Sequence, residues 1–247
     1  MGVLLALVLR VCADPNNMPF SNRAGEGLEN AMARLLAREL RAELQYTWLP
    51  QRRGFVRNTM GADKCDVMME VPAGYGRTLA TRPWYRSTYV FVYRKDRAYA
   101  LRSLDDPALR SLRIGVQMVG DDYANTPPAH ALGKRGLARN VVGFSIYGDY
   151  SRPAPLAPIL EAVRKGEVDV ALVWGPLAGW YAKKSEVPLE IVPVLPAADP
   201  PVSFVFDIAV GVKKGSDRLL RLLDAALSRR KPEIDAILGR YGVPRVP

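Results

Sequence analysis

The sequence predicts an α/β protein of two similar lobes, each a mainly parallel sheet flanked by helices. The order β-α-β-α-β occupies roughly the first 70 residues, and parallel strands need such crossover connections. The same order starts again after "YVFVYRKD". The 247 residues are 49% hydrophobic and 24% charged, which is an ordinary globular composition with room for one or two cores.

The first half opens with a short buried strand, "LRVCA", and the turn-rich loop "PNNMPFSNRAGEG". A helix is expected from about Glu26 to Leu40, because apolar residues recur there at helical spacing. Next come the strand "LQYTWL", a short helix in "QRRGFVRNTM" closed by Gly61, and the strand "CDVMMEV".

In the second half, strands are expected in "LRIGVQ", "VVGFSIY", "VDVALVWG" and "LEIVPVL". Helices alternate with them in "TPPAHALGKRG", "APLAPILEAVRKG" and "LAGWYAKK". A long strand in "FVFDIAVGVKK" precedes two amphipathic helices, from about Asp217 to Ser228 and from about Pro232 to Tyr241.

These elements divide the chain into lobe one, residues 1–95 with 205–247, and lobe two, residues 96–204. Two extended crossover segments, near Val92–Asp96 and Val202–Asp207, connect the lobes. Because open α/β sheets bind ligands at the carboxyl ends of their strands, a cleft between the lobes is the expected site.

The stretch "VGDDYANTPPAHAL" contains the only histidine, His130, and the adjacent carboxylates Asp121 and Asp122. Asn125 or Thr126 is a good helix N-cap, and the two carboxylates before it complement the helix dipole. One histidine and two adjacent aspartates fall short of the three or four converging ligands of a metal site. We therefore expect a structural helix start and no metal.

The net charge of +10 and the pI near 9.7 favour an anionic partner. The densest basic runs, "QRRGFVR" and "LSRRKP", lack interleaved aromatic residues, so an acidic protein is favoured over nucleic acid. The longest apolar run, "VLLALVL", is far shorter than the about 20 residues of a transmembrane helix. It is either the remnant of a signal peptide or the lead-in to the first strand.

No catalytic residue and no cofactor are predicted. Ser145 and Ser151 have no histidine nearby in the sequence, and "GYGRT" lacks the strand–loop–helix context of a phosphate-binding loop. The two cysteines, Cys12 and Cys65, are either unrelated buried thiols or one disulfide of an oxidising compartment.

Six motifs resemble one family. They are "LRVCADPNNMPFSN", "KCDVMMEVPAGYGR", "TRPWYRSTYVFVYR", "GVQMVGDDYANTPPAHAL", "YGDYSRPAPLAPILEAV" and "GEVDVALVWGPLAGWYA". They look like the MoxJ/XoxJ group, binding-protein-like accessories associated with pyrroloquinoline-quinone (PQQ) methanol dehydrogenases. The likeness runs from about Leu9 to Tyr241.

This resemblance implies the type II periplasmic-binding-protein fold, a periplasmic location, a monomer and a PQQ-dependent methanol dehydrogenase as partner. In that fold "RVC" and "KCDVMM" are neighbouring parallel strands, so Cys12 and Cys65 would lie within bridging reach. A disulfide there would stabilise the protein by roughly 3–4 kcal/mol.

Amino-acid-binding relatives hold the ligand carboxylate with an arginine, for which Arg77 is a loose candidate. Asp121 and Asp122 would repel that carboxylate at the helix start of lobe two. Trp174 begins the stretch where such relatives often carry an acid for the ammonium group. An ordinary amino-acid carrier is therefore disfavoured.

Aromatic side chains dominate the predicted loops and strand ends, and about half of them are expected to pack internally. Such a surface suits a peptide or protein segment better than a small polar solute. With Arg77, the predicted cleft residues are Phe20, Tyr75, Trp84, Tyr85, Tyr123, Tyr147, Tyr150 and Trp174.

The sequence thus predicts a non-catalytic periplasmic accessory that assists maturation or activation of a methanol dehydrogenase. The alternative is an extracytoplasmic solute receptor of an ABC transporter for a small organic solute.

Overall fold

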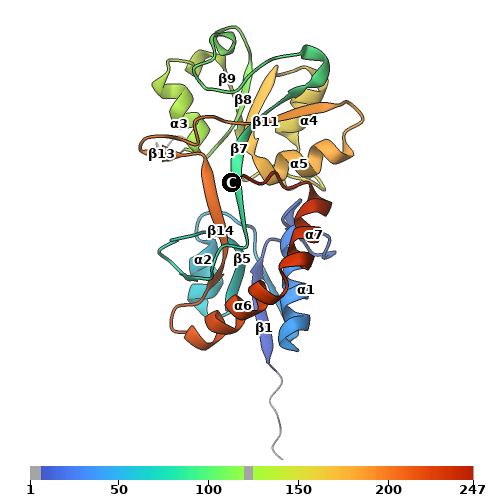
Figure 1. Ribbon diagram of the computed structural model, residues 1–247, viewed down its shortest axis with the longest axis vertical. Coiled ribbons are helices and arrows are strands. Elements are labelled where there is room, and N and C mark those ends of the chain that lie inside the picture. The colour runs from blue at the N-terminus through green and yellow to red at the C-terminus, as the bar shows by residue number, and fades with distance from the viewer. Residues whose placement is uncertain (1–6, 120–124, 247) are drawn as a thin grey trace, which may run out of the picture. The chain divides into compact units, whose positions relative to one another are not determined.

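The computed structural model describes residues 7–119 and 125–246 (Figure 1). The chain divides into two compact units. Unit 1 comprises residues 1–86 and 207–240, and unit 2 comprises residues 87–206 and 241–247. Two of the three boundaries fall inside long strands, β7 (Tyr85–Arg94) and β14 (Val205–Val212), so each of these strands contributes to both units; the third falls at the end of the last helix.

The sheet of unit 1 has the order β4 (Glu43–Trp48), β1 (Val8–Ala13), β5 (Val67–Pro72) and β14. Strand β1 is parallel to both β4 and β5, as the β-α-β-α-β order predicts. Strand β14 is antiparallel to β5, and the short β6 (Leu79–Ala80) is antiparallel to β14. The sheet is therefore mixed.

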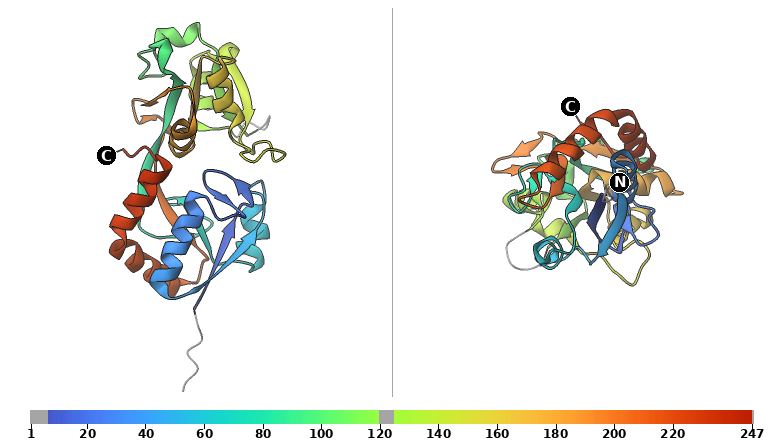
Figure 2. Two further views of the ribbon diagram at one scale, coloured as in Figure 1. Left: turned by 90° about the vertical axis from the view of Figure 1, so that its right-hand side faces the viewer. Right: turned by 90° about the horizontal axis from the view of Figure 1, so that it is seen from below.

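Four helices belong to this part of the chain: α1 (Leu28–Leu40), the short α2 (Phe55–Asn58), α6 (Asp217–Arg229) and α7 (Lys231–Tyr241). Helix α1 packs against β1, β4 and β5, and α6 packs on α1 (Figure 2). A two-residue hairpin of β2 (Asn16–Asn17) and β3 (Ser21–Asn22) precedes α1.

Helix α1 begins at Leu28, two residues after the predicted start at Glu26, and Gly27 is its N-cap. The Oδ1 atom of Asn30 accepts hydrogen bonds from the backbone N–H groups of Gly27 (3.1 Å) and Asn22 (3.0 Å). The backbone at Gly27 lies so close to Phe20 that a Cβ atom would stand 2.1 Å from the Phe20 carbonyl oxygen. Only glycine fits this approach.

The sheet of unit 2 has the order β11 (Leu189–Pro193), β7, β10 (Val170–Trp174), β8 (Ile114–Met118) and β9 (Val141–Ser145). Strand β8 is parallel to β10 and β9, whereas β7 is antiparallel to β10 and β11. Helices α3 (Pro127–Lys134), α4 (Pro158–Lys165) and α5 (Gly175–Lys184) accompany it, with a small hairpin of β12 (Ala198–Asp199) and β13 (Val202–Ser203).

The start of α3 confirms the prediction made from the histidine window. Thr126 is the N-cap, and its hydroxyl donates to the carbonyl oxygen of Gln117 (2.6 Å). His130 is exposed, and its Nε2 atom accepts from the backbone N–H of Asn125 (3.3 Å). Asp121, Asp122 and Tyr123 lie outside the described residues.

Within residues 7–119 and 125–246, no helix has the length and apolar character needed to cross a bilayer. The same residues contain no group of three or more His, Cys, Asp or Glu side chains placed to hold a metal ion.

Candidate functional site

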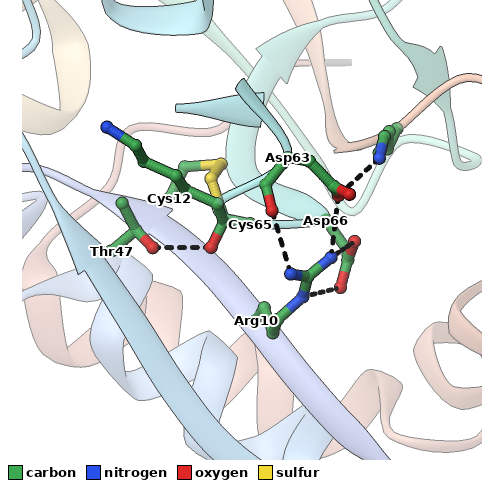
Figure 3. Close-up of polar contacts among 8 residues, drawn as sticks. Arg10, Cys12, Thr47, Asp63, Cys65 and Asp66 are labelled. Carbon is green, nitrogen blue, oxygen red and sulfur yellow. Dashed lines mark hydrogen bonds and ion pairs between the residues drawn. A yellow bond between two sulfur atoms is a disulfide. The ribbon is translucent and has the colours of Figure 1, made fainter. Parts of the chain in front are cut away.

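A disulfide joins Cys12 of β1 to Cys65, just before β5, and confirms the expected bridge (Figure 3). The register pairs Val11 with Val67, which brings the two cysteines to a Cα–Cα distance of 5.4 Å. The bridge is fully buried at Cys65 and lies among Phe55, Met60 and other apolar side chains.

An ion-pair cluster lies beside the disulfide (Figure 3). The Arg10 guanidinium donates to both carboxyl oxygens of Asp66, at 2.7 and 2.6 Å, and to the carboxyl group of Asp63 at 3.1 Å. Lys213, at the end of β14, also pairs with Asp63 (2.6 Å). These cations hold the pKa of Asp63 below its ordinary value. The cluster ties β1, the segment before β5 and β14 together, so Asp63 and Asp66 have a structural role here.

Three acidic side chains gather toward the carboxyl ends of the parallel strands of unit 1, where α/β sheets usually bind ligands. Asp14 directly follows β1 and is 2% exposed, Glu70 belongs to β5, and Glu29 in the first turn of α1 is 8% exposed. The carboxyl oxygens of Asp14 accept from the backbone N–H groups of Asn16 (2.8 Å) and Gln51 (2.5 Å). We call Asp14, Glu29 and Glu70 the acidic cluster.

Burial raises the pKa of both glutamates of the acidic cluster. Burial raises the pKa of Glu70 to about 8, partly opposed by the Tyr85 hydroxyl, which donates to Glu70 Oε1 (3.0 Å). Burial, followed by the charges of Glu70 and Asp14, raises the pKa of Glu29 well above its ordinary value. A buried carboxyl group that cannot be paired with a cation is most stable when protonated.

Ser21 lies beside Glu29 and Asp14. Its hydroxyl donates to the carbonyl oxygen of Asp14 (3.0 Å) and accepts from the backbone N–H of Asp14 (3.2 Å). The contact of Ser21 with the Glu29 carboxyl group lowers the pKa of Glu29 and so partly opposes the effect of burial. The space enclosed by the acidic cluster, Cys12 and Phe55 has no volume for a water molecule. The acidic cluster therefore offers no room for a substrate between its side chains.

Of the predicted cleft residues in unit 1, Trp84 and Tyr85 are 4% and 5% exposed. The Trp84 Nε1–H donates to the carbonyl oxygen of Met69 (3.1 Å), so both side chains brace β5. Tyr75 packs against the apolar cluster that contains the disulfide, Phe20 is half-buried, and Arg77 is exposed. The structure brings Trp84 and Tyr85 together, with ring centroids 4.6 Å apart.

In unit 2, Trp174 at the end of β10 belongs to an aromatic triad. Its ring centroid lies 5.5 Å from that of Tyr89 on β7 and 5.9 Å from that of Phe206 on β14. The Tyr89 and Phe206 centroids are 6.4 Å apart, and all three ring pairs meet edge-to-face. Burial raises the pKa of Tyr89 to about 12. Tyr147 and Tyr150, both half-buried, lie in the segment after β9. We call Tyr89, Trp174 and Phe206 the aromatic triad.

The sequence analysis missed Glu29, Glu70, Tyr89 and Phe206. Signals for the glutamates were available: Glu29 shares the apolar face of its helix with Met32, and Glu70 interrupts the apolar strand "CDVMMEV". Tyr89 and Phe206 lie in "YVFVYRKD" and "FVFDIAVGVKK", stretches to which the sequence analysis assigned no binding residue.

Comparisons with known proteins define the class. At 38% identity and a TM-score of 0.80, the structure is similar to the crystal structure of the periplasmic binding protein XoxJ from Methylobacterium extorquens AM1, covering 97% of this chain and 100% of that one. It is similar to MxaJ from Methlophaga aminisulfidivorans MPT at 27% identity and a TM-score of 0.83, with the same coverage. The fold is that of a periplasmic binding protein.

The sequence is 32% identical over 250 residues to protein MoxJ of Methylorubrum extorquens, covering 97% of this chain and 82% of the relative. The chain therefore belongs to the MoxJ family. No family model matches it.

Proposed function

We propose that this chain is a non-catalytic periplasmic accessory that binds a PQQ-dependent methanol dehydrogenase and assists its maturation or activation. Membership of the MoxJ family carries this proposal, because the similarity extends over 97% of the chain. The XoxJ relative, a periplasmic binding protein by name, supports the location. The buried disulfide also fits an oxidising compartment.

The site chemistry supports binding rather than catalysis. The acidic cluster leaves no space for a water molecule between its side chains, so a substrate does not fit there. The aromatic triad instead offers rigid, partly exposed rings of the kind that anchor protein segments. We propose that Trp174 and the exposed or half-buried members of the predicted aromatic set contact the partner.

The net charge of +10 supports an acidic partner, because opposite charges accelerate association and strengthen it at low salt. The test is biolayer interferometry of this chain against purified methanol dehydrogenase, in apo and holo forms, at low and high salt. Binding that weakens with salt and prefers one form would support the accessory role and identify the maturation step. Absence of binding to both forms at low salt would contradict it.

Trp174→Ala tests the aromatic contribution, with Trp180→Ala as its control. Trp180 lies on α5 under the ammonium group of Lys184, 4.4 Å from the ring centroid, and is not part of the aromatic triad. Loss of the Trp174 ring should weaken binding by about tenfold, as for an aromatic anchor. The alternative, a solute receptor, predicts a small organic ligand that raises the melting temperature of the isolated chain.

A further inference from the structure

A groove of about 620 Å³ opens on unit 2, and none of its lining residues belongs to the acidic cluster or the aromatic triad. One wall is the edge strand β11 with the end of β7, and the other is the loop of residues 98–102. Within the part of the chain that the structure describes, β11 pairs only with β7. The groove therefore lies beside an open sheet edge.

The floor of the groove is apolar and fixed in place. Tyr93 is 4% exposed, and its hydroxyl donates to the carbonyl oxygen of Tyr99 (2.5 Å) while the two rings meet edge-to-face at 5.5 Å. Leu101 is fully buried beneath them, and Val192 of β11 packs against the same core. A preformed floor loses little conformational entropy when a partner binds.

The rim of the groove combines an exposed apolar side chain with cations. Leu195 is 51% exposed, the highest value among the exposed large hydrophobic residues of the described chain. Lys95 and Arg102 are exposed, and neither side chain makes a hydrogen bond or ion pair with another described residue, although their backbone groups are hydrogen-bonded. Glu190 is the one acidic lining residue, and it lies on β11 directly opposite Tyr93. The exposed rim is thus positively charged.

We propose that this groove binds an extended acidic segment of the partner protein. An apolar side chain of the segment packs between Tyr99 and Leu195, and flanking carboxylates pair with Lys95 and Arg102. The charge of the rim selects an acidic occupant, and the open edge of β11 suits a chain in extended conformation. This inference rests on the proposed function, because it assigns the dehydrogenase to a surface of unit 2.

Charge reversal tests the rim. Arg102→Glu is compared with Arg218→Glu, an exposed α6 residue of unit 1 that changes the net charge equally. Arg102→Glu should weaken binding to methanol dehydrogenase by about tenfold and flatten its salt dependence, whereas Arg218→Glu should change it by less than about twofold. Leu195→Asp, also at an exposed position, should weaken binding to a similar extent.

A single thiol reports on the groove directly, because both native cysteines are in the disulfide. Leu195→Cys carrying bimane should shift its emission to the blue when dehydrogenase is added, and Arg218→Cys carrying the same dye should not. If wild type binds but Arg102→Glu and Leu195→Asp bind equally well, the groove assignment is wrong and the proposed function stands.

If wild type does not bind, the proposed function fails, and this inference fails with it. An emission shift that depends only on the concentration of the chain itself would instead make a second copy the occupant, and would also overturn the assignment.

Discussion

Glu70→Gln should make the protein more stable at alkaline pH while leaving it almost unchanged at acidic pH. Glu70 has an ordinary pKa of 4.5, which burial raises to about 8 in the folded chain. Between pH 4.5 and about 8, Glu70 therefore keeps its proton in the folded state but has lost it in the unfolded state. Stability from this group is complete below pH 4.5 and is lost as the pH rises through about 8.

The size of the effect follows from the shift. Each pKa unit corresponds to about 1.36 kcal/mol, so the full change gives an upper limit of about 5 kcal/mol. Glu29 lies close to Glu70 and titrates in the same direction, so the two groups share this energy. We expect Glu70→Gln to raise the free energy of unfolding by about 2 kcal/mol above pH 8.5. The glutamine oxygen can still accept the hydrogen bond from Tyr85.

Urea unfolding followed by tryptophan fluorescence, at about pH 5 and about pH 8.5, measures this difference. A gain of about 2 kcal/mol corresponds to a midpoint shift of about 1 M urea. Glu43→Gln is the matched control, because Glu43 lies exposed on β4 of the same unit. If the free energies of unfolding of wild type and Glu70→Gln differ by the same amount at both pH values, the pKa of Glu70 is not raised in the folded state. The argument from burial in the acidic cluster is then refuted.

Two further substitutions test the elements that position the acidic cluster. Replacing Cys12 and Cys65 by alanine should cost about 4 kcal/mol, because the bridge closes a chain segment with a sequence separation of 53; an unchanged urea midpoint would contradict this. Gly27→Ala should destabilise the chain by at least about 2 kcal/mol, because its Cβ atom would stand 2.1 Å from the Phe20 carbonyl oxygen. Gly133→Ala in α3 meets nothing within 4 Å and should be neutral or stabilising in the same melt, so equal losses in the two variants would disprove the steric argument.

Local periodicity and turn chemistry predicted most elements of the fold. The apolar spacing that ends at Leu40 gave the end of α1, and Thr126 with the following prolines marked the start of α3. These signals lie within one element, so tertiary packing does not alter them. The start of α1 was placed two residues early because the close approach of Gly27 to Phe20 joins segments that only the folded chain brings together.

The candidate site was less predictable, because its chemistry depends on burial. Exposed and buried aromatic residues have the same appearance in a sequence, and Trp84 turned out to brace β5 through Met69. Glu29 and Glu70 lie 41 positions apart, and only the packing of α1 on β5 makes them titrate together. The disulfide was predictable because the family resemblance supplied the strand order, which cysteine spacing alone does not give.

The acidic cluster also bears on what kind of binding protein this is. A solute receptor needs open polar groups at the carboxyl ends of its strands, where a small ligand exchanges water for protein contacts. In unit 1 that position is filled by Asp14, whose oxygens are bound to backbone N–H groups, and by Glu29 and Glu70, whose pKa values burial raises, with no space for water between them. Opening it to a ligand would expose Glu29 and Glu70 further to solvent, which favours their carboxylate forms, and these repel an anion. The cluster thus favours a rigid unit that presents its surface to a partner, in agreement with the proposed accessory role.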